Sequence, residues 1–246
     1  MTKLCRCLLV IFFFGPLYGA ASELDRLTFI TEHYPPYNYL DERELKGSSV
    51  GILEAMLQHA GSTTETTDIR VLPWARGYDT TLLTPDAVLF STTRTSARED
   101  LFQWVGPLAA GRVVLLARKD SNISIQNQEA LQNGNVSMVV IGEDIGAQKL
   151  LESGVNAARM HTAVNNESAM NMLVANRVNL WAYGEDVAHW LLRKHGHDPD
   201  DFETVYVLSQ DPLYFAINRD TDPAVVERLQ QILDDLRVRG KIPPIE

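Results

Sequence analysis

Residues 87–98 read Ala-Val-Leu-Phe-Ser-Thr-Thr-Arg-Thr-Ser-Ala-Arg, an apolar run that becomes polar after its fourth residue. The run 87–90 predicts a buried strand, and the polar residues after it predict a helix over 96–102. Buried strands that lead into helices are typical of α/β proteins. Ligands of such proteins bind beyond the carboxyl ends of the strands, where loops lead into helices. This stretch therefore predicts a fold class and also the edge at which a ligand would bind.

The same alternation of β-like runs and amphipathic segments extends outward on both sides. Gly61 predicts the end of one helix, while Asp222, Pro223 and Gly240 predict the start and the end of the last helix. The pattern as a whole predicts an α/β fold with largely parallel sheets. We predict strands at 27–31, 69–72, 87–90, 112–117, 136–141, 178–183 and 213–218, and helices at 50–60, 75–83, 96–102, 146–153, 167–175, 185–195 and 223–239.

Composition narrows the class of protein. The chain has 246 residues, of which 45% are hydrophobic and 22% charged, as in ordinary folded soluble proteins. This length allows one large domain or two smaller lobes. A formal charge of −10 argues against nucleic acid or an anionic membrane surface as the main partner.

The first 22 residues have the order of a secretory signal peptide. Lys3 and Arg6 precede the apolar run 8–14, and small residues follow at 19–22, which predicts cleavage near Ala21. A membrane anchor is the alternative, but the apolar run is much shorter than the ~20 residues that span a bilayer. We therefore expect a periplasmic protein that is secreted through a cleaved signal peptide.

Both cysteines, Cys5 and Cys7, precede the apolar run and would leave with the signal peptide. The mature chain would then hold no disulfide, no thiolate metal site and no cysteine nucleophile. Its formal charge would change from −10 to −12, because two cations leave with the peptide.

Aromatic side chains follow the first two predicted strands. Tyr34 begins a segment, 34–39, that contains three tyrosines and two prolines. Trp74 and Arg76 follow the second strand. These residues can form ring faces and a fixed cation for a small ligand. Alternatively, the tyrosines cover an edge of the core, Trp74 lies in the core and Arg76 lies at the surface.

The segment after the third strand, 91–98, carries five hydroxyl residues and two arginines. Hydroxyls, N–H groups at a helix start and guanidinium groups together suit a carboxylate or a similar anion. A helix-capping role would explain one hydroxyl but not the cluster. We therefore predict an anion site that includes Ser91, Thr93, Arg94 and Arg98.

In the second half, Gly146 and Gln148 lie at a predicted strand-to-helix junction and are candidates for a cleft. Glu185 follows another strand and can bind a cation, although acids at helix starts commonly interact only with the helix dipole. The segment 195–198 has metal-binding residue types but no further ligands nearby. No nucleophile motif, phosphate loop or dinucleotide motif occurs, so we expect no catalytic residue, no metal and no cofactor.

These segments occur in a recognisable order. The chain resembles, over almost its whole mature length, the bacterial extracellular solute-binding proteins of family 3, which include the polar amino-acid receptors of ABC importers. The resemblance rests on segments 34–37, 50–53, 91–98, 102–107 and 236–242.

The resemblance implies a type II periplasmic-binding fold, in which two α/β lobes are joined by a two-strand hinge. Lobe 1 would contain residues 23–111 and 211–246, and lobe 2 would contain residues 112–210. The strand at 112–117 and the segment leading to residue 213 would form the two crossovers.

The resemblance also implies roles for single residues. Arg98 matches the arginine that binds the α-carboxylate of the ligand, and Ser91 and Thr93 match neighbouring polar contacts. Tyr34 and Trp74 match rings on either side of the ligand. In lobe 2, Gln148 and the backbone before it match contacts at a helix start.

One position departs from the pattern of amino-acid-binding members. Such members usually carry a carboxylate for the α-ammonium group at the position that aligns with Gly184. In this chain the acids come later, at Glu185 and Asp186, and Arg76 and Arg94 add positive charge to the predicted cleft. A more negative ligand without an ammonium group therefore stays an alternative to an ordinary amino acid.

We predict a monomeric solute-binding protein, not an enzyme, that captures a small anionic or zwitterionic solute for ABC-type uptake. Its ligand would be an amino acid or a related carboxylate, and its partner an ABC permease or a membrane receptor. The first alternative is a periplasmic enzyme that resembles cyclohexadienyl dehydratases, with Glu32, His33 and Glu185 as acid/base candidates. The second is a ligand sensor for a membrane receptor.

Overall fold

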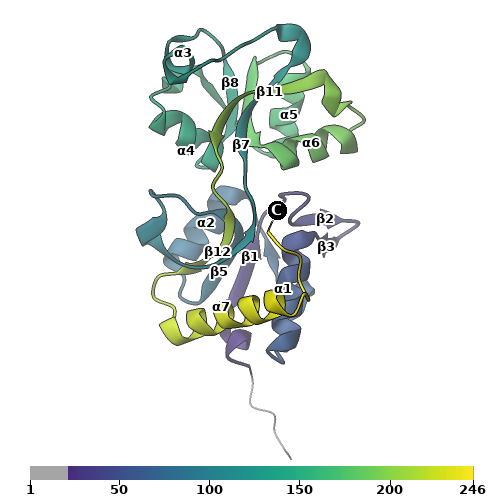
Figure 1. The fold of residues 1–246 in the computed structure, drawn as a ribbon, viewed down its shortest axis with the longest axis vertical. Coiled ribbons are helices and arrows are strands. Elements are labelled where there is room, and N and C mark those ends of the chain that lie inside the picture. Colours follow the sequence, from purple (N-terminus) through teal and green to yellow (C-terminus); the bar gives the residue numbers. More distant parts are fainter. Residues whose placement is uncertain (1–21, 246) are drawn as a thin grey trace, which may run out of the picture.

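The computed structural model describes residues 22–245. Apart from Ser22, the predicted signal peptide, with Cys5 and Cys7, lies outside the described residues. The described part of the chain forms two five-stranded sheets and a two-stranded hairpin, and helices cover both sheets (Figure 1). The predicted α/β class is confirmed.

The first sheet has the strand order β4-β1-β5-β12-β6. Strand β1 pairs in parallel with β4 and β5, whereas β12 is antiparallel to both of its neighbours. Its strands are β1 (Thr28–Thr31), β4 (Arg70–Val71), β5 (Ala87–Thr93), β6 (Phe102–Ala109) and β12 (Leu213–Asn218).

The second sheet has the order β11-β7-β10-β8-β9. Strands β10, β8 and β9 are parallel to one another, and β7 is antiparallel to both β10 and β11. Its strands are β7 (Val113–Arg118), β8 (Met138–Ile141), β9 (Met160–Ala163), β10 (Leu180–Gly184) and β11 (Phe202–Ser209). Each sheet thus mixes parallel with antiparallel pairs, so the expectation of largely parallel sheets was wrong. Every antiparallel pair of these two sheets contains β7 or β12. These strands, like β6 and β11, lie next to the points where the chain passes between the sheets.

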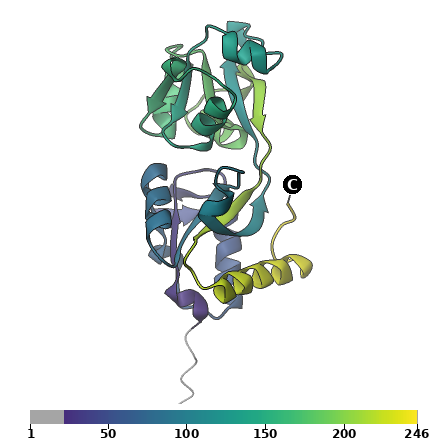
Figure 2. The same cartoon turned by 90° about the vertical axis from the view of Figure 1, so that its left-hand side faces the viewer.

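We use the name lobe 1 for the first sheet with its helices and lobe 2 for the second sheet with its helices. The chain passes between the lobes twice, through residues 110–112 and 210–212, on one side of the molecule (Figure 2). We therefore propose lobe boundaries after residues 111 and 210.

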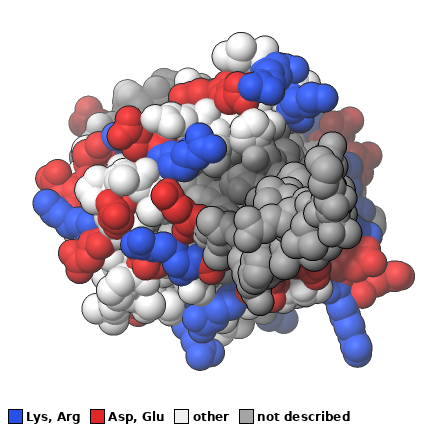
Figure 3. Space-filling model, turned by 90° about the horizontal axis from the view of Figure 1, so that it is seen from below, with Lys and Arg blue, Asp and Glu red and all other residues white. Residues whose placement is uncertain are grey.

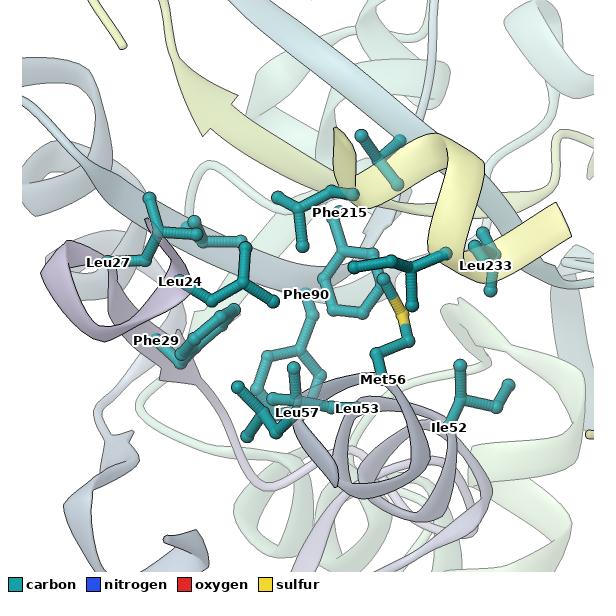
Figure 4. Packing of buried hydrophobic residues seen from close by; sticks show 14 of the residues in the cluster. Leu24, Leu27, Phe29, Ile52, Leu53, Met56, Leu57, Phe90, Phe215 and Leu233 are labelled. Atoms are coloured by element: carbon teal, nitrogen blue, oxygen red, sulfur yellow. The ribbon is translucent and has the colours of Figure 1, made fainter. Parts of the chain in front are cut away.

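Helices α1 and α7 cover one face of the first sheet, and α2 packs on the opposite face. Figure 4 shows the core beneath α1 and α7, where Phe90 and Phe215 of the sheet meet Met56 of α1 and Leu233 of α7. The predicted ends are confirmed: Asp222 caps α7, and Gly61 and Gly240 adopt positive φ angles. The helices are α1 (Ser48–His59), α2 (Trp74–Leu83) and α7 (Pro223–Val238).

Lobe 2 has a core on each face of its sheet. Helices α5 and α6 pack on one face, and α3 and α4 on the other. The bounds are α3 (Gln128–Asn133), α4 (Ile145–Glu152), α5 (Asn166–Val174) and α6 (Glu185–Lys194).

The prediction of a helix over 96–102 is wrong. Residues 96–98 form a turn, residues Glu99–Leu101 form a short 3-10 helix, and β6 begins at Phe102. Strand β6 pairs with β12, more than 100 residues further along the chain, and local periodicity does not report such a partner. The hairpin of β2 (Tyr39–Asp41) and β3 (Glu44–Lys46), the strands β9 and β11 and the helix α3 were also not predicted.

Two observations describe helix length and surface charge in the part of the chain that the structure describes. Within residues 22–245, no helix is long and apolar enough to cross a bilayer. Acidic and basic side chains are interspersed over the visible part of the end of lobe 1 that points away from lobe 2 (Figure 3).

Candidate functional site

The loop after β1 inserts two tyrosines from lobe 1 into the core of lobe 2. Tyr34 and Tyr37 are buried and belong to the apolar cluster of that lobe. The Tyr34 ring stacks on Tyr37 with centroids 5.7 Å apart and meets Tyr183 of β10 edge-on at 5.6 Å. Gly47 supports this loop, because a Cβ atom there would lie 2.2 Å from the carbonyl oxygen of Tyr37. The loop therefore forms one side of the interface between the two lobes, which we call the seam.

The Tyr34 hydroxyl fills the space beside Gly184. A Cβ atom at position 184 would lie 2.4 Å from that oxygen, which is closer than such atoms approach. Position 184 is where the resemblance places the carboxylate of amino-acid-binding members. A side chain at position 184 would therefore have to displace the Tyr34 hydroxyl.

Arg98 lies buried at the seam, with 3% of its surface exposed. Its guanidinium group lies over the Trp74 ring at 4.9 Å and over the Tyr78 ring at 5.3 Å. It donates hydrogen bonds to the carbonyl oxygens of Thr93, at 3.3 Å, and of Glu143 in lobe 2, at 3.4 Å. The Trp74 Nε1 group donates to the same Glu143 oxygen at 2.9 Å. Among residues 22–245, no carboxylate forms an ion pair with Arg98.

Two buried carboxyl groups lie near Arg98. Glu32 follows β1 in lobe 1 and Asp144 precedes α4 in lobe 2. Burial raises the pKa of Glu32 well above its ordinary value; the charge of Asp144 adds to this effect and Arg98 opposes it. Burial also raises the pKa of Asp144 to about 6, against the opposing influence of Arg98 and of the Ile145 N–H group. Both shifts follow from removing a carboxylate from water, to which a nearby like charge adds for Glu32.

Several buried polar atoms have no hydrogen-bond partner in the described part of the chain. They include Asp144 Oδ2, Thr31 Oγ1 and the Tyr183 hydroxyl. Burial raises the pKa of Tyr183, and the charges of Glu32 and Asp144 raise it further. Unpartnered polar atoms are costly inside a protein, so each of these atoms can accept a polar partner.

A cavity of about 460 Å³ opens between the lobes, and Glu32 and Trp74 line it, whereas Arg98 and Asp144 do not. Its volume is within the range of small-molecule sites. None of the residues that line it is a lysine or an arginine. Burial lowers the pKa of its histidine, His33, and the charge of Glu167 opposes this effect. Its lining comes from both lobes: Glu32, His33, Val71, Leu72, Pro73, Trp74, Ile141, Val164, Asn165, Asn166 and Glu167.

The other residues predicted for the anion site separate into two groups. Ser91 and Thr93 are buried at the end of β5, where the Ser91 hydroxyl donates to Ser49 at 2.9 Å and the Thr93 carbonyl holds Arg98. Arg94 instead forms an ion pair with Glu99 on the outer side of this segment.

Arg76 lies on an exposed side of α2. The structure therefore brings together Arg98, Thr93 and Trp74, but it places Arg76 and Arg94 outside this group. Tyr34 instead contacts Tyr37 and Tyr183.

The residues predicted in lobe 2 also differ in position. Gly146 packs so closely on β10 that a Cβ atom would lie 2.3 Å from the Ala182 carbonyl oxygen. The Gln148 amide donates across the seam to Thr95 Oγ1 at 3.4 Å. Glu185 is directed toward the hinge, where it pairs with Arg112 and accepts a hydrogen bond from Thr204.

Sequence reasoning missed Asp144, Asn166 and Tyr183. Asn166 donates from lobe 2 to the His33 carbonyl oxygen at 2.9 Å, and its position in the first turn of a helix carries no signal of that contact. Asp144 had a signal, because an acid between a buried strand and a helix is placed where ligands bind in α/β folds. No group of three or more metal-binding side chains occurs in the described range, and His195 contacts Glu167 instead.

Comparison with known proteins gives a match over nearly the whole chain. A family model described as "Bacterial extracellular solute-binding proteins, family 3" matches residues 27–246. No curated protein matches the sequence significantly.

Solved structures show the same fold at low sequence identity. A histidine kinase sensor domain with similarity to periplasmic binding proteins is 18% identical, with a TM-score of 0.77 and coverage of 89% of this chain and 93% of that chain. Holo ArgBP from T. maritima is 18% identical, with a TM-score of 0.71 and coverage of 86% and 90%. The ancestral amino-acid-binding protein AncCDT-1, a precursor of cyclohexadienyl dehydratase, is 20% identical, with a TM-score of 0.70 and coverage of 89% and 95%. At these identities the likeness establishes the periplasmic-binding-protein fold.

Proposed function

The chain belongs to the bacterial extracellular solute-binding proteins of family 3, and from this premise we propose that it captures a small solute between its two lobes. The solute is an amino acid or a related carboxylate, either zwitterionic or anionic. Solved structures with this fold include arginine-bound and other amino-acid-binding proteins, which supports this class of ligand.

The observation that carries the proposal is the state of Arg98. Its guanidinium group is buried, yet its hydrogen bonds go to the neutral carbonyl oxygens of Thr93 and Glu143. A buried charge is costly unless an opposite charge pairs with it. A solute carboxylate can supply that charge and accept two parallel hydrogen bonds from the guanidinium group.

Both lobes contribute to the proposed capture. Trp74 and Tyr34 place aromatic surfaces at the seam, and Glu143 links Trp74 and Arg98 of lobe 1 to lobe 2. A solute that contacts both lobes stabilises the arrangement in which they meet. Exclusion of water then strengthens the charged hydrogen bonds to the solute.

We further propose that the mature protein acts in the periplasm as a monomer without a cofactor and delivers its solute to an ABC permease. A membrane receptor is the alternative partner, in which case the protein acts as a sensor. Reconstitution with the candidate permease in vesicles distinguishes these roles, because uptake requires ATP and release of solute into the lumen.

Catalysis is a second candidate function, and the raised pKa of Glu32 favours it, because a neutral buried carboxyl group can act as a general acid. The candidate reaction is that of a cyclohexadienyl dehydratase. Incubation of the pure protein with prephenate or arogenate tests it. Turnover would replace capture as the function, whereas recovery of unchanged compound leaves the binding proposal in place.

A thermal-shift screen of amino acids and dicarboxylates tests capture, followed by calorimetry on Arg98→Ala. A solute at 100 times its dissociation constant stabilises a protein by about 2.7 kcal/mol. We expect Arg98→Ala to lose about 2–5 kcal/mol of binding free energy, the range for a broken buried charge pair. Arg76→Ala serves as the control, because Arg76 is exposed. Unchanged affinity in Arg98→Ala would show that this residue is not the anchor.

A further inference from the structure

We propose that Tyr78 is a positioning residue: together with Trp74 it holds the guanidinium group of Arg98 against two neighbouring aromatic rings, which fixes that group for a solute carboxylate. This inference rests on the proposed function, because it assigns what orients the residue that anchors the solute. Tyr78 is not among the residues that line the cavity between the lobes, so its effect on the solute passes through Arg98.

Helix α2 places the two rings side by side. Trp74 and Tyr78 are four residues apart, about one helical turn, so they lie on the same face of the helix. Their ring centroids are 5.4 Å apart, and their planes are tilted by 36°. The helix lies close to the sheet at Gly77, where a Cβ atom would be only 3.3 Å from Leu89 Cδ1 of β5. This packing brings both rings beside the segment that follows β5, where Arg98 lies.

The guanidinium group of Arg98 contacts both rings. Its carbon atom lies 4.9 Å from the centroid of the Trp74 ring and 5.3 Å from that of the Tyr78 ring. Both distances are in the range of cation–π contacts, which are strongest where water is excluded. Arg98 is 3% exposed, so water is largely excluded here. The two rings therefore replace part of the interaction with water that a buried guanidinium group loses.

Tyr78 is itself supported by the sheet of lobe 1. Its ring meets the ring of Phe102 edge-on, with centroids 5.3 Å apart and planes at 74°. This is a favoured geometry for a pair of aromatic rings. Phe102 is the first residue of β6 and is 5% exposed. Tyr78 thus connects Arg98 with a side chain that is fixed in the sheet, and a binding group needs such a rigid support.

No acidic side chain takes the place of these rings. Among residues 22–245, no carboxylate forms an ion pair with Arg98, whereas Arg94, four residues earlier, pairs with Glu99. Burial raises the pKa of Tyr78, and the charge of Arg98 opposes this effect, so the phenol group is uncharged at neutral pH. A neutral ring stabilises a cation without cancelling its charge. The full charge of Arg98 therefore remains for a solute carboxylate.

The two rings also order Arg98 before a solute binds. A long side chain that becomes ordered only on binding lowers the affinity, because its rotamer freedom is then lost. A guanidinium group that already rests against Trp74 and Tyr78 avoids most of this loss. Removal of the Tyr78 ring should therefore weaken the contact with the carboxylate of a solute and leave its contacts with the cavity unchanged.

The experiment compares probes that differ in the carboxylate alone. The probes are L-arginine, L-glutamine and L-phenylalanine, each with its C-terminal primary amide, at about pH 6, where the amino groups of both forms are protonated. Calorimetry measures both affinities on the same mature protein, and the ratio of acid to amide affinity reports the contact with Arg98. A merely structural defect lowers both affinities and leaves the ratio unchanged.

Three variants and a control define the expected result. We expect Tyr78→Ala to lower the ratio about tenfold, as for the loss of a cation–π contact that is shielded from water. Tyr78→Phe keeps the ring and should retain the wild-type ratio within about twofold. Arg98→Ala should remove the preference for the acid. Tyr206→Ala is the control, because Tyr206 is half-buried like Tyr78 but packs in lobe 2, and it should keep the wild-type ratio.

A second measurement needs no solute. The Nε–H group of Arg98 gives a magnetic resonance signal in isotope-labelled protein, identified as the signal that Arg98→Lys removes. This signal reports the ring currents of neighbouring aromatic side chains and the exchange of its proton with water. We expect Tyr78→Ala to shift the signal and to speed the exchange, whereas Tyr78→Phe should leave both close to the wild type.

The outcomes separate this inference from the proposed function. A wild-type ratio in Tyr78→Ala overturns the positioning role, and an unchanged Arg98 signal overturns the contact itself. If Tyr78→Phe behaves as Tyr78→Ala does, the hydroxyl and not the ring holds Arg98, which also overturns the inference. A wild-type ratio in Arg98→Ala instead overturns the proposed anchor. If no probe binds, the amino-acid class of solute is overturned, and the solute-free signal still decides whether Tyr78 holds Arg98.

Discussion

Burial determines the behaviour of individual residues at the seam. Arg76, Arg94 and Arg98 occur within 23 residues of one another and look alike in the sequence. Only Arg98 is buried and free of an ion pair within the described residues, whereas Arg94 pairs with Glu99 and Arg76 is exposed. The difference in burial and pairing between the three arginines therefore comes from their surroundings.

Asp144 gives a prediction about pH at the same scale. Its pKa in the folded protein, about 6, is above the ordinary value, so the native state holds this proton more tightly than the unfolded state does. The stability it contributes is complete below about pH 4, the ordinary range, and is lost as the pH rises through about 6. We expect urea unfolding free energies to fall between these pH values, by at most about 1.4 kcal/mol per pH unit for this proton.

Asp144→Asn should flatten this decline. The charge of Asp144 also raises the pKa of Glu32, and Arg98 opposes this effect. In Asp144→Asn this contribution is lost, so the pKa of Glu32 should fall as well. Asp198→Asn is a matched control, because Asp198 also caps a helical turn but is exposed. Parallel pH profiles for the wild type and Asp144→Asn would contradict the raised pKa.

At the scale of elements, helices with strong end signals form where the sequence predicts them. Helix α7 begins at Pro223 after Asp222, and Gly240 follows it with a positive φ angle. Strands such as β6 and β11 were missed, because their partners lie far away in the sequence. Helix ends depend on local hydrogen bonds, whereas strands depend on distant pairing.

The cap of α7 gives a prediction about stability. The Asp222 carboxylate accepts a hydrogen bond from the Ala224 N–H group at 3.0 Å. We expect Asp222→Ala to lower the unfolding free energy by about 0.5–2 kcal/mol, measured by urea denaturation. Asp220→Ala changes a neighbouring exposed carboxylate outside the helix and should have a smaller effect. Equal losses in the two variants would show that charge, and not the cap, is responsible.

At the scale of the whole molecule, the lobes interlock through the tyrosine loop. Tyr34 and Tyr37 leave lobe 1 and pack in the core of lobe 2. The Tyr37 hydroxyl donates to Asp186 at 2.7 Å, and Asn166 reaches back to the loop from lobe 2. Because His33 and Asn166 also line the cavity, a change in the distance between the lobes changes the shape of the cavity.

Tyr37→Phe tests this coupling. Loss of the hydrogen bond to Asp186 removes about 1 kcal/mol from the arrangement in which the lobes meet. We expect solute affinity to fall about fivefold and small-angle scattering to report a larger radius of gyration at subsaturating solute. Tyr206→Phe is the control, because the Tyr206 hydroxyl bonds to no other described residue and lies within lobe 2. Unchanged affinity and scattering in Tyr37→Phe would show that this contact does not contribute to closure.

The sequence by itself determined the α/β class, the family and the helix ends, because apolar periodicity and capping residues act over a few neighbouring positions. It also identified Arg98, Tyr34 and Trp74 as candidates, since they follow strands. Only the tertiary structure decided that Glu32 and Asp144 are both buried and that the Tyr34 hydroxyl fills the space beside Gly184. These relations depend on which strand ends meet when two lobes pack, and on how burial then shifts a charge, and neither is encoded by spacing along the chain.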